Sequence, residues 1–516
     1  MIQRGKKTDS SEQKMATGET AAVAPTAATQ NERLSALARE AAVALTHHSI
    51  SPVLLTGFAR LAEFTLIAAA GAAIYFGYVV PRDGANIAYT LPILAGSLLT
   101  VVFIQLAGAY TVPALRTPIP TIGRVFAAWS VVFAVFAVLA FLAKIGDQYS
   151  RVWIATWFFT GLVVLALFRV GLTVVVRRWS AKGLLDRHAV IVGGGPPAEA
   201  LINELERDGD GNVRIVGIFD DRKDERSPAV VAGYPKLGSI AELVDFGRVA
   251  RVDLLIVSLP ITAENRLLQL LKQLWVLPVD IRLSAHTNKL RFRPRTYSFL
   301  GKVPFLDVID KPIADWDYVA KWAFDRVVGA IALVVAAPIM ALTALAIRLD
   351  SPGPVLFKQK RYGFNNELIE VYKFRSMHMN QTDANAVKLV TKDDPRVTRV
   401  GRFIRKTSLD ELPQLFNVVF NGNLSLVGPR PHAVQAKASD RLYDEVVDGY
   451  FARHRVKPGI TGWAQINGWR GETDTENKIQ QRVEHDLHYI ENWSVLFDLY
   501  IVLMTPFRLL SSENAY

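Results

Sequence analysis

Two adjacent acids, Asp410 and Glu411, lie in a stretch rich in side chains that can do phosphate chemistry. A carboxylate can attack phosphorus to form an acyl-phosphate. Because a carboxylate and a pyrophosphate repel each other, that reaction needs nearby cations, and guanidinium groups suit phosphate well. The residues ahead of the acids supply such cations at every third position: Arg396, Arg399, Arg402 and Arg405, followed directly by Lys406. The stretch therefore predicts a phosphoryl-transfer site.

The helix that follows must position these acids. Its apolar residues have amphipathic spacing, at Leu412, Leu415, Phe416 and Val419. Pro413 is best tolerated in a first helical turn, so we expect the helix to begin close to Asp410. Free N–H groups and the helix dipole favour an anion at such an end. A structural alternative remains open, because Ser408-x-x-Glu411 also has the spacing of a capping box.

Four longer runs are more specific than these short patterns: KFRSM at 373–377, TSLDELPQ at 407–414, SLVGPRP at 425–431 and VKPGITGWAQ at 456–465. In this order they closely resemble the bacterial monotopic phosphoglycosyl transferases, in their large form. These enzymes transfer a sugar-1-phosphate to a polyprenyl phosphate. The resemblance covers roughly Trp316 to the C-terminus.

The resemblance implies roles for individual residues. Asp410 is expected to attack the β-phosphate of a UDP-sugar and release UMP, and Glu411 to hold Mg²⁺. The acceptor is then undecaprenyl phosphate, and the reaction is the first step of exopolysaccharide or capsule synthesis. The run from Asn467 to Thr475 resembles the subgroup that uses UDP-glucose. The candidates for binding phosphate are Arg405, Arg396, Lys373, Arg375 and Arg430, whereas Lys358–Arg361 is expected to form a solvated or lipid-facing surface.

The composition indicates a membrane protein with soluble parts. The chain has 516 residues, 50% of them hydrophobic, and a formal net charge of +11. It contains no cysteine, which excludes disulfides and thiolate metal sites. The basic residues cluster beside apolar runs and around the acid pair, so we expect the headgroups of membrane lipid and the phosphates of a nucleotide sugar as partners rather than nucleic acid. The resemblance specifies these further as a UDP-sugar and undecaprenyl phosphate.

The N-terminal half is predicted to contain a disordered tail at 1–50, with a short helix near its end, and four transmembrane helices at 51–180. Basic residues favour one side of these helices, which places both ends of the bundle in the cytoplasm. The resemblance implies a bacterial protein of the inner membrane, with the catalytic domain on its cytoplasmic face. Glu63 and Arg169 fall inside the spans near their ends, and we expect their side chains to reach the interface.

Residues 181–286 alternate strand and helix patterns and predict a Rossmann-like cytoplasmic domain. The loop Gly193-x-Gly195-x-x-Ala198 suggests a nucleotide or coenzyme site, with Asp220 or Asp221 for a ribose. However, two prolines in the loop remove N–H groups, so a scaffolding, dimerising or regulatory domain is the favoured interpretation and a bound nucleotide or coenzyme is the alternative. A connector follows at 287–315.

Residues 316–516 make up the expected catalytic domain. Its first apolar run, Val327–Ile347, is long enough to cross a membrane but contains Pro338 at its middle, where we expect the membrane helix to break. A crossing would separate the Rossmann-like domain from the phosphate-binding stretch, and the resemblance implies a re-entrant helix instead. The last apolar run, Val495–Leu510, is too short to span and predicts an interfacial helix.

The sequence thus predicts a membrane protein of the α plus α/β class, with a four-helix transmembrane bundle, a Rossmann-like domain, and a re-entrant membrane helix leading into a mixed catalytic domain. Two other functions stay open. One is a membrane-bound nucleotide-sugar oxidoreductase that uses the Rossmann-like domain, and the other is a non-enzymatic platform for polysaccharide assembly. The oligomeric state is open, with a homodimer as one expectation.

Overall fold

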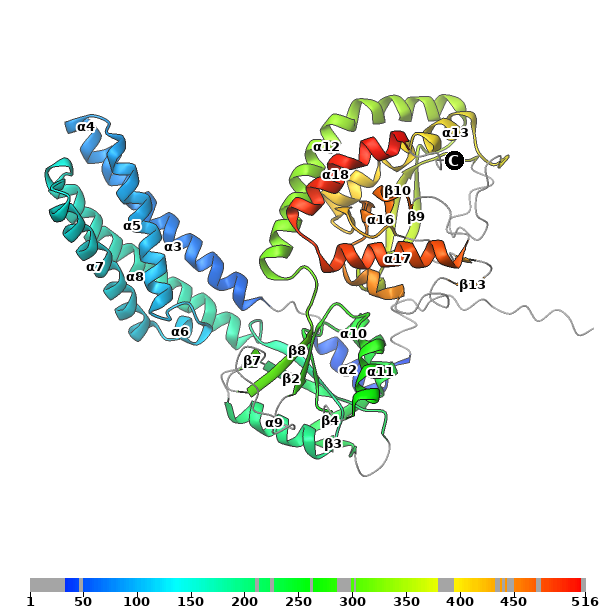
Figure 1. Cartoon of the computed structure of the whole chain (residues 1–516), viewed down its shortest axis with the longest axis horizontal. Coiled ribbons are helices and arrows are strands. Elements are labelled where there is room, and N and C mark those ends of the chain that lie inside the picture. Colours follow the sequence, from blue (N-terminus) through cyan, green and yellow to red (C-terminus); the bar gives the residue numbers. More distant parts are fainter. Residues whose placement is uncertain are drawn as a thin grey trace, which may run out of the picture.

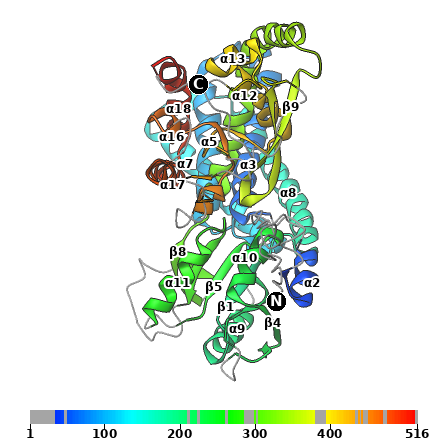
Figure 2. The same ribbon diagram turned by 90° about the vertical axis from the view of Figure 1, so that its right-hand side faces the viewer.

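The computed structural model describes residues 33–45, 50–208, 213–222, 227–259, 263–284, 298–300, 303–378, 394–431, 437–438, 441–442, 450–469 and 475–511. Figure 1 shows three parts: a bundle of long helices, an α/β domain, and a C-terminal domain built around strands β9 and β10. Figure 2 shows the α/β domain and the C-terminal domain placed one above the other.

Four long helical segments form the bundle. Their elements are α3 (Pro52–Ile74), η1 (Tyr75–Val79), α4 (Val80–Asp83), η2 (Ile87–Tyr89), α5 (Thr90–Leu106), α6 (Val112–Arg116), α7 (Pro118–Leu142), η3 (Gly146–Gln148) and α8 (Arg151–Ala181). Each of the four is long and apolar enough to cross a membrane. The start of α3 meets the end of α8, where the N–H of Ile50 donates to the carbonyl of Leu184 at 2.6 Å. Both ends of the bundle therefore lie on one side.

A buried ion pair joins two of these helices. Arg169 of α8 donates to both carboxylate oxygens of Glu63 on α3, at 2.5 and 3.0 Å, and the hydroxyl of Tyr110 donates to the same carboxylate. Glu63 is 0% exposed and Arg169 is 2% exposed. The prediction that these side chains reach the interface was wrong, because each charge neutralises the other inside the bundle.

The α/β domain is built on one sheet with the strand order β3-β4-β2-β1-β5-β6-β8-β7. Its elements are β1 (Arg187–Val192), α9 (Pro196–Asp208), β2 (Val213–Phe219), β3 (Val230–Val231), β4 (Tyr234–Gly238), α10 (Ile240–Val249), β5 (Leu254–Val257), α11 (Glu264–Leu274), β6 (Asp280–Ser284), β7 (Ser298–Leu300) and β8 (Val303–Ile309). Strands β4, β2, β1, β5 and β6 are parallel neighbours. This is the predicted Rossmann-like topology.

Two segments assigned elsewhere by sequence belong to this domain. Strands β7 and β8 pair antiparallel with each other, and β8 pairs with β6, so the assignment of 287–315 to a connector was wrong. Helix α2 (Ala36–Ala44), inside the predicted tail, buries Ala38 and Ala42 in the core of the domain.

The C-terminal domain joins short strands to a framework of helices. Its elements are α12 (Asp315–Asp350), β9 (Leu356–Tyr362), η6 (Phe364–Asn366), β10 (Leu368–Phe374), α13 (Arg399–Lys406), η8 (Leu409–Glu411), α14 (Gln414–Phe416), η9 (Asn417–Asn421), β11 (Ser425–Val427), β12 (Lys437–Ala438), β13 (Arg441–Leu442), η10 (Tyr450–Arg455), β14 (Gly459–Thr461), α16 (Trp463–Ile466), α17 (Glu476–Glu491) and α18 (Val495–Ser511). Strands β9 and β10 form an antiparallel pair, and β11 pairs with β14 in parallel.

Helix α12 is unbroken through Pro338 and bends around the C-terminal domain (Figure 1). Both of its halves are tied to that domain. In the first half, Asp325 accepts the N–H of Leu426 at 3.0 Å. At the far end, Asp350 accepts the N–H of Val400 at 3.2 Å. The helix therefore leaves the domain and returns to it.

A buried polar cluster fixes the first half of α12 against α18. The ammonium group of Lys321 lies 2.6 Å from the carboxylate of Asp498 and donates to the carbonyl of Val427 at 3.0 Å. The hydroxyl of Tyr489 donates to Asp498 at 2.7 Å. Asp498, which interrupts the apolar pattern of the last helix, is 0% exposed and so serves as an internal anchor.

Helix α12 also touches the bundle at its first turn. The indole of Trp316 packs over Gly57 of α3, where a Cβ atom would overlap the ring, and it lies 5.2 Å from the ring of Phe58. The hydroxyl of Ser51 donates to Asp315 beside this contact. The small residue at position 57 thus lets the two helices approach closely.

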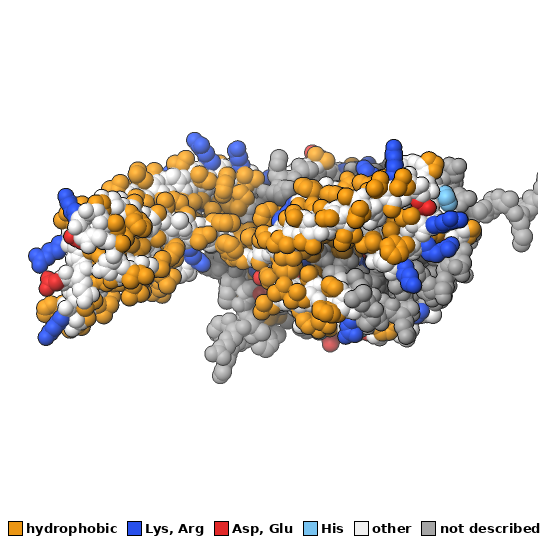
Figure 3. Space-filling view, turned by 90° about the horizontal axis from the view of Figure 1, so that it is seen from above, with side chains coloured by type: hydrophobic (Ala, Val, Ile, Leu, Met, Phe, Trp, Pro, Cys, Tyr) orange, Lys and Arg blue, Asp and Glu red, His pale blue; other side chains and the backbone are white. Residues whose placement is uncertain are grey.

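Apolar side chains cover the outer surfaces of these helices (Figure 3). On α12 and α18 the exposed ones are Val327, Ile331, Val334, Val335, Leu342, Leu345, Leu496, Leu499, Leu503 and Phe507. A soluble domain rarely exposes so many large apolar side chains on adjoining helices. This surface is therefore suited to lipid.

Candidate active site

The chain turns sharply between α13 and the acid pair. Thr398 caps the start of α13 by accepting the N–H of Gly401 at 2.9 Å. A Cβ atom at Gly401 would overlap the carbonyl of Ser376, so α13 lies directly on the segment that follows β10. Ser408 then adopts a left-handed conformation with φ of 58°. The next helical segment begins at Leu409, which confirms the predicted helix start near the acids.

One buried amide fastens this segment to β10. Asn417 is 0% exposed, and its side chain accepts the N–H of Tyr372 at 2.9 Å and donates to the carbonyl of Glu370 at 2.7 Å. The helical segment is thereby held in register with the end of the strand. Lys373, the next residue of β10, consequently reaches the acid pair.

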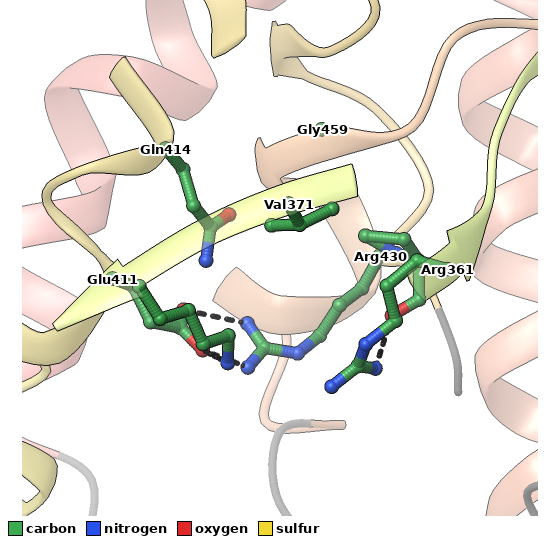
Figure 4. A pocket seen from close by; sticks show the side chains of 8 residues that line it. Arg361, Val371, Glu411, Gln414, Arg430 and Gly459 are labelled. Atoms are coloured by element: carbon green, nitrogen blue, oxygen red, sulfur yellow. Dashed lines mark hydrogen bonds and ion pairs between the residues drawn. The ribbon is translucent and has the colours of Figure 1, made fainter. Parts of the chain in front are cut away.

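Glu411 is engaged on both of its oxygens. Oε1 lies 2.9 Å from Nζ of Lys373 and 2.5 Å from Nη2 of Arg430, and Oε2 accepts from Nη1 of Arg430 at 3.1 Å (Figure 4). Burial would raise the pKa of Glu411, but Arg430 and Lys373 outweigh it and hold the pKa well below its ordinary value. Ser408 makes no side-chain capping bond, so the capping box is not formed.

Asp410 has a different environment. Among the residues that the structure describes, none donates a hydrogen bond to its carboxylate or forms an ion pair with it. Burial raises the pKa of Asp410 to about 6, with Glu411 adding to the rise and Lys373 and Arg405 opposing it. At neutral pH this carboxylate is ionised yet unbonded. Adjacent carboxylates with such unequal pKa values are typical of a division of chemical roles.

The loop that carries Arg430 is held rigidly. Three successive carbonyls of this loop accept hydrogen bonds from three different segments. The carbonyl of residue 429 accepts from the N–H of Gly459 at 3.0 Å, that of residue 430 from the side chain of Arg453 at 2.8 Å, and that of residue 431 from the side chain of Arg361 at 2.8 Å. Arg453 is fully buried and would be costly to move. Arg430 is therefore fixed at its backbone and directed at Glu411.

The structure separates the predicted phosphate ligands into two groups. Lys373 and Arg430 meet at the acids, and the charge of Arg405 acts on Asp410. Arg375 is buried and donates to the carbonyls of Ser351 and Pro352 at the end of α12. Arg396 is bound to the carboxylate of Asp394, with the closest contact at 2.5 Å. Neither Arg375 nor Arg396 lines the pocket at the acids.

That pocket has a volume of about 240 Å³ and includes side chains that the sequence interpretation missed. It is lined by Arg361, Val371, Lys373, Glu411, Gln414, Arg430, Pro431 and Gly459 (Figure 4). The stretch Lys358–Arg361 is only in part a surface, because it is a strand in which Lys358 and Lys360 are exposed while Gln359 and Arg361 face inward. Strand alternation would have found Arg361. Residues 470–474 of the predicted UDP-glucose motif lie outside the described part of the chain.

The comparisons identify relatives of the whole chain. A family model described as "Bacterial sugar transferase" matches residues 316–512. A UDP-glucose:undecaprenyl-phosphate glucose-1-phosphate transferase of Xanthomonas campestris pv. campestris is 33% identical over 483 residues, covering 91% of this chain and 98% of its own. This chain belongs to the bacterial sugar transferase family. Both the acid pair and the pocket lie within the matched region, so the resemblance of the C-terminal domain is confirmed.

Two further bacterial sugar transferases extend the comparison. The enzyme of the same name from Escherichia coli (strain K12) is 37% identical over 374 residues, which is 72% of this chain and 77% of its own. An "Exopolysaccharide production protein PSS" of Rhizobium leguminosarum bv. phaseoli is 49% identical over 189 residues, which is 37% of this chain and 94% of its own.

A second family model, described as a "CoA-binding domain", matches residues 105–285 of this sugar transferase. The glycine loop after β1 does not fit a coenzyme pyrophosphate. The N–H of Gly194 already donates to Asp220 at 2.8 Å, and Arg222 binds the same carboxylate at 2.7 Å. Burial would raise the pKa of Asp220, but the bonds from Arg222 and Gly194 lower it to about 2. Pro196 and Pro197 offer no N–H groups.

Asp221, the other acid predicted to bind a ribose, also accepts a hydrogen bond from within the protein. Asp221 accepts the N–H of Ile240 at 2.8 Å, at the start of α10. Both acids after β2 therefore stabilise the fold. The geometry gives no support to the oxidoreductase alternative, which requires a nicotinamide cofactor in this loop.

Proposed function

We propose that this protein transfers hexose-1-phosphate, with glucose-1-phosphate from UDP-glucose as the favoured donor group, to undecaprenyl phosphate and releases UMP. The observation that carries the proposal is the contrast between the acids. Glu411 is saturated by Lys373 and Arg430, whereas the carboxylate of Asp410 is ionised at neutral pH and has no bonded partner among the described residues. The names of the relatives support the donor and the acceptor.

The reaction follows as two displacements. A carboxylate oxygen of Asp410 forms a bond to the β-phosphorus, and the bond from that phosphorus to the bridging oxygen breaks, so that UMP leaves with the electron pair. An oxygen of undecaprenyl phosphate then attacks the same phosphorus, and the carboxylate of Asp410 leaves. Lys373, Arg405 and Arg430 offset the phosphate charge in both steps.

Mg²⁺ is part of the proposal. The described residues contain no group of three or more His, Cys, Asp or Glu that could hold a metal ion. Mg²⁺ commonly takes one or two carboxylates and completes its shell with water and substrate phosphates, which fits Asp410 and Glu411. We assign the ion to Glu411, and when bound it neutralises charge on the diphosphate. Glu411 would exchange part of its contact with Lys373 or Arg430 for the ion.

The hydrogen bonds of α12 support a proposal for how the C-terminal domain lies on the membrane. Because both halves of this helix bond to the C-terminal domain, a full crossing would place one domain on two sides of a bilayer. A re-entrant path through the apolar stretch around Pro338 removes that conflict. With the apolar face of α18 lying in the interface, the pocket sits at headgroup depth, where a lipid phosphate meets a water-soluble nucleotide. Nucleotide sugars are cytoplasmic, so this face of the inner membrane is the cytoplasmic one.

The pathway follows from the chemistry and from one relative. A sugar linked to undecaprenyl diphosphate is the starting unit on which further sugars are added, and the relative of Rhizobium leguminosarum is named for exopolysaccharide production. We therefore place the reaction at the first step of exopolysaccharide or capsule synthesis. A homodimer stays a prediction.

The test is UMP release from the full chain in detergent, with Mg²⁺ and with or without undecaprenyl phosphate. UDP-glucose, UDP-galactose and UDP-N-acetylglucosamine are compared as donors. Lipid-dependent UMP from UDP-glucose is expected, and no UMP from any donor in folded protein would favour the assembly-platform function. With β-³²P-labelled UDP-glucose and no lipid, label on the protein that hydroxylamine removes is expected for the wild type and not for Asp410→Asn.

A further inference from the structure

The side chain of Gln414 has no role in the reaction described above. It lies one helical turn beyond Glu411, and the residue is 4% exposed. Its carboxamide has no hydrogen-bond partner among the described residues. Figure 4 shows the carboxamide pointing into the pocket, on the side of the Glu411–Arg430 ion pair that faces Val371.

A carboxamide held almost entirely inside the protein without a partner is unfavourable for folding, because it has lost most of its contact with water and gained no hydrogen bond in return. An apolar side chain of similar size, such as leucine, would fill the same position without that cost. The neighbours of Gln414 in the chain show this pattern, since Pro413 and Leu415 are both buried and apolar. The amide is therefore arranged for a group that enters the pocket.

We propose that Gln414 binds a hydroxyl of the hexose of the UDP-hexose donor and so contributes to the choice of sugar. This inference rests on the proposed function. The pocket already presents Lys373, Arg430 and Arg361 to phosphate. A carboxamide instead offers both a donor and an acceptor, which matches a sugar hydroxyl.

The position of Gln414 along the chain favours the hexose over the nucleoside. It is four residues from Asp410, the attacking group, at the start of the short helix α14 that follows the turn η8 on which Asp410 lies. The hexose is attached directly to the phosphorus that Asp410 attacks. The uracil is separated from that phosphorus by the ribose and the α-phosphate, so it lies farther from this turn of helix.

The experiment compares Gln414→Leu with wild type, using UDP-glucose and its 2-, 3-, 4- and 6-deoxy analogues. With UDP-glucose, kcat/KM of Gln414→Leu is expected to fall by about 10- to 100-fold. One deoxy analogue should cause a similar loss in the wild type and no further loss in the variant, because the two changes remove the same bond. The inhibition constant of UDP should be unchanged.

Three results would overturn the inference. The first is an unchanged kcat/KM in Gln414→Leu. The second is that, for every deoxy analogue, the loss of kcat/KM caused by the analogue and the loss caused by the variant multiply. The third is a raised inhibition constant for UDP, which would assign the amide to phosphate or uracil. Gln414→Met repeats the test if Gln414→Leu folds poorly, and Gln480→Leu, on the exposed face of α17, is the matched control. If the wild type itself releases no UMP, the proposed function fails; if only the Gln414 variants are unaffected, this inference alone fails.

Discussion

Replacing the two acids one at a time by their amides should shift the stability of the protein in opposite directions. The pKa of Asp410 rises from 3.8 to about 6 in the folded protein, chiefly through burial. Each tenfold change in an ionisation equilibrium corresponds to about 1.4 kcal/mol. Keeping Asp410 ionised at pH 8 therefore costs the folded state about 3 kcal/mol, and Asp410→Asn removes that cost.

The pH dependence of stability shows the direction in which Asp410→Asn acts. Because the folded state binds the proton of Asp410 more tightly than the unfolded chain does, the cost is absent below about pH 4, grows between pH 4 and 6, and is complete above. Asp410→Asn should thus raise the melting temperature at pH 8, on the order of 5 °C for a domain of this size, and change it little near pH 4. Turnover should fall by about 10³-fold or more.

Glu411→Gln is the matched control. It makes the same chemical change at the neighbouring residue, but it leaves Lys373 and Arg430 without a carboxylate, so the melting temperature at pH 8 should fall. The assay is thermal unfolding in detergent, at one heating rate because unfolding of membrane proteins is often irreversible. If both variants shift the melting temperature in the same direction at pH 8, the assignment of distinct roles to the two acids is refuted.

Three further predictions use other parts of the structure. The rate of UMP release should fall about fivefold between pH 6 and pH 5 as Asp410 takes up a proton, and a flat profile would count against it as the nucleophile. Asp498→Ala leaves the buried Lys321 with only the longer 3.4 Å contact to the carboxylate of Asp325 and should lower the free energy of unfolding by about 3 kcal/mol, measured by thermal or denaturant unfolding, with Asp498→Asn less harmful. Glu63→Leu should destabilise the bundle more than the double replacement with Arg169→Leu does, and equal losses would show that the two side chains act independently.

The sequence was most informative where chemistry and local pattern coincide. The helix start at Asp410 follows from Pro413 and the apolar spacing, and the motifs named Lys373 and Arg430 as phosphate ligands, which the structure places against Glu411. Arg375 carries the same charge but supports the end of α12, because a motif says which residues matter without saying which way each side chain points.

Contacts between distant segments were beyond the reach of local pattern. The charges of Glu63 and Arg169 are 106 residues apart, and only the packing of α3 on α8 shows that they neutralise each other. The role of Asn417 is similar, since its two bonds go to a strand about 45 residues earlier. The amphipathic pattern of one helix does not show which distant residue Glu63 or Asn417 contacts.

Because Trp316 of α12 packs against Gly57 of α3, we expect the depth of the active site relative to the membrane to depend on the helix bundle. Helix α3 tilts to match the thickness of the hydrocarbon layer around it, and the first turn of α12 is attached to it. We therefore expect a thicker or thinner bilayer to move the first turn of α12, and with it the C-terminal domain that contains the pocket. Hydrophobic mismatch becomes a variable of the reaction, so the lipid composition of the membrane acts on this enzyme through geometry as well as through the supply of acceptor.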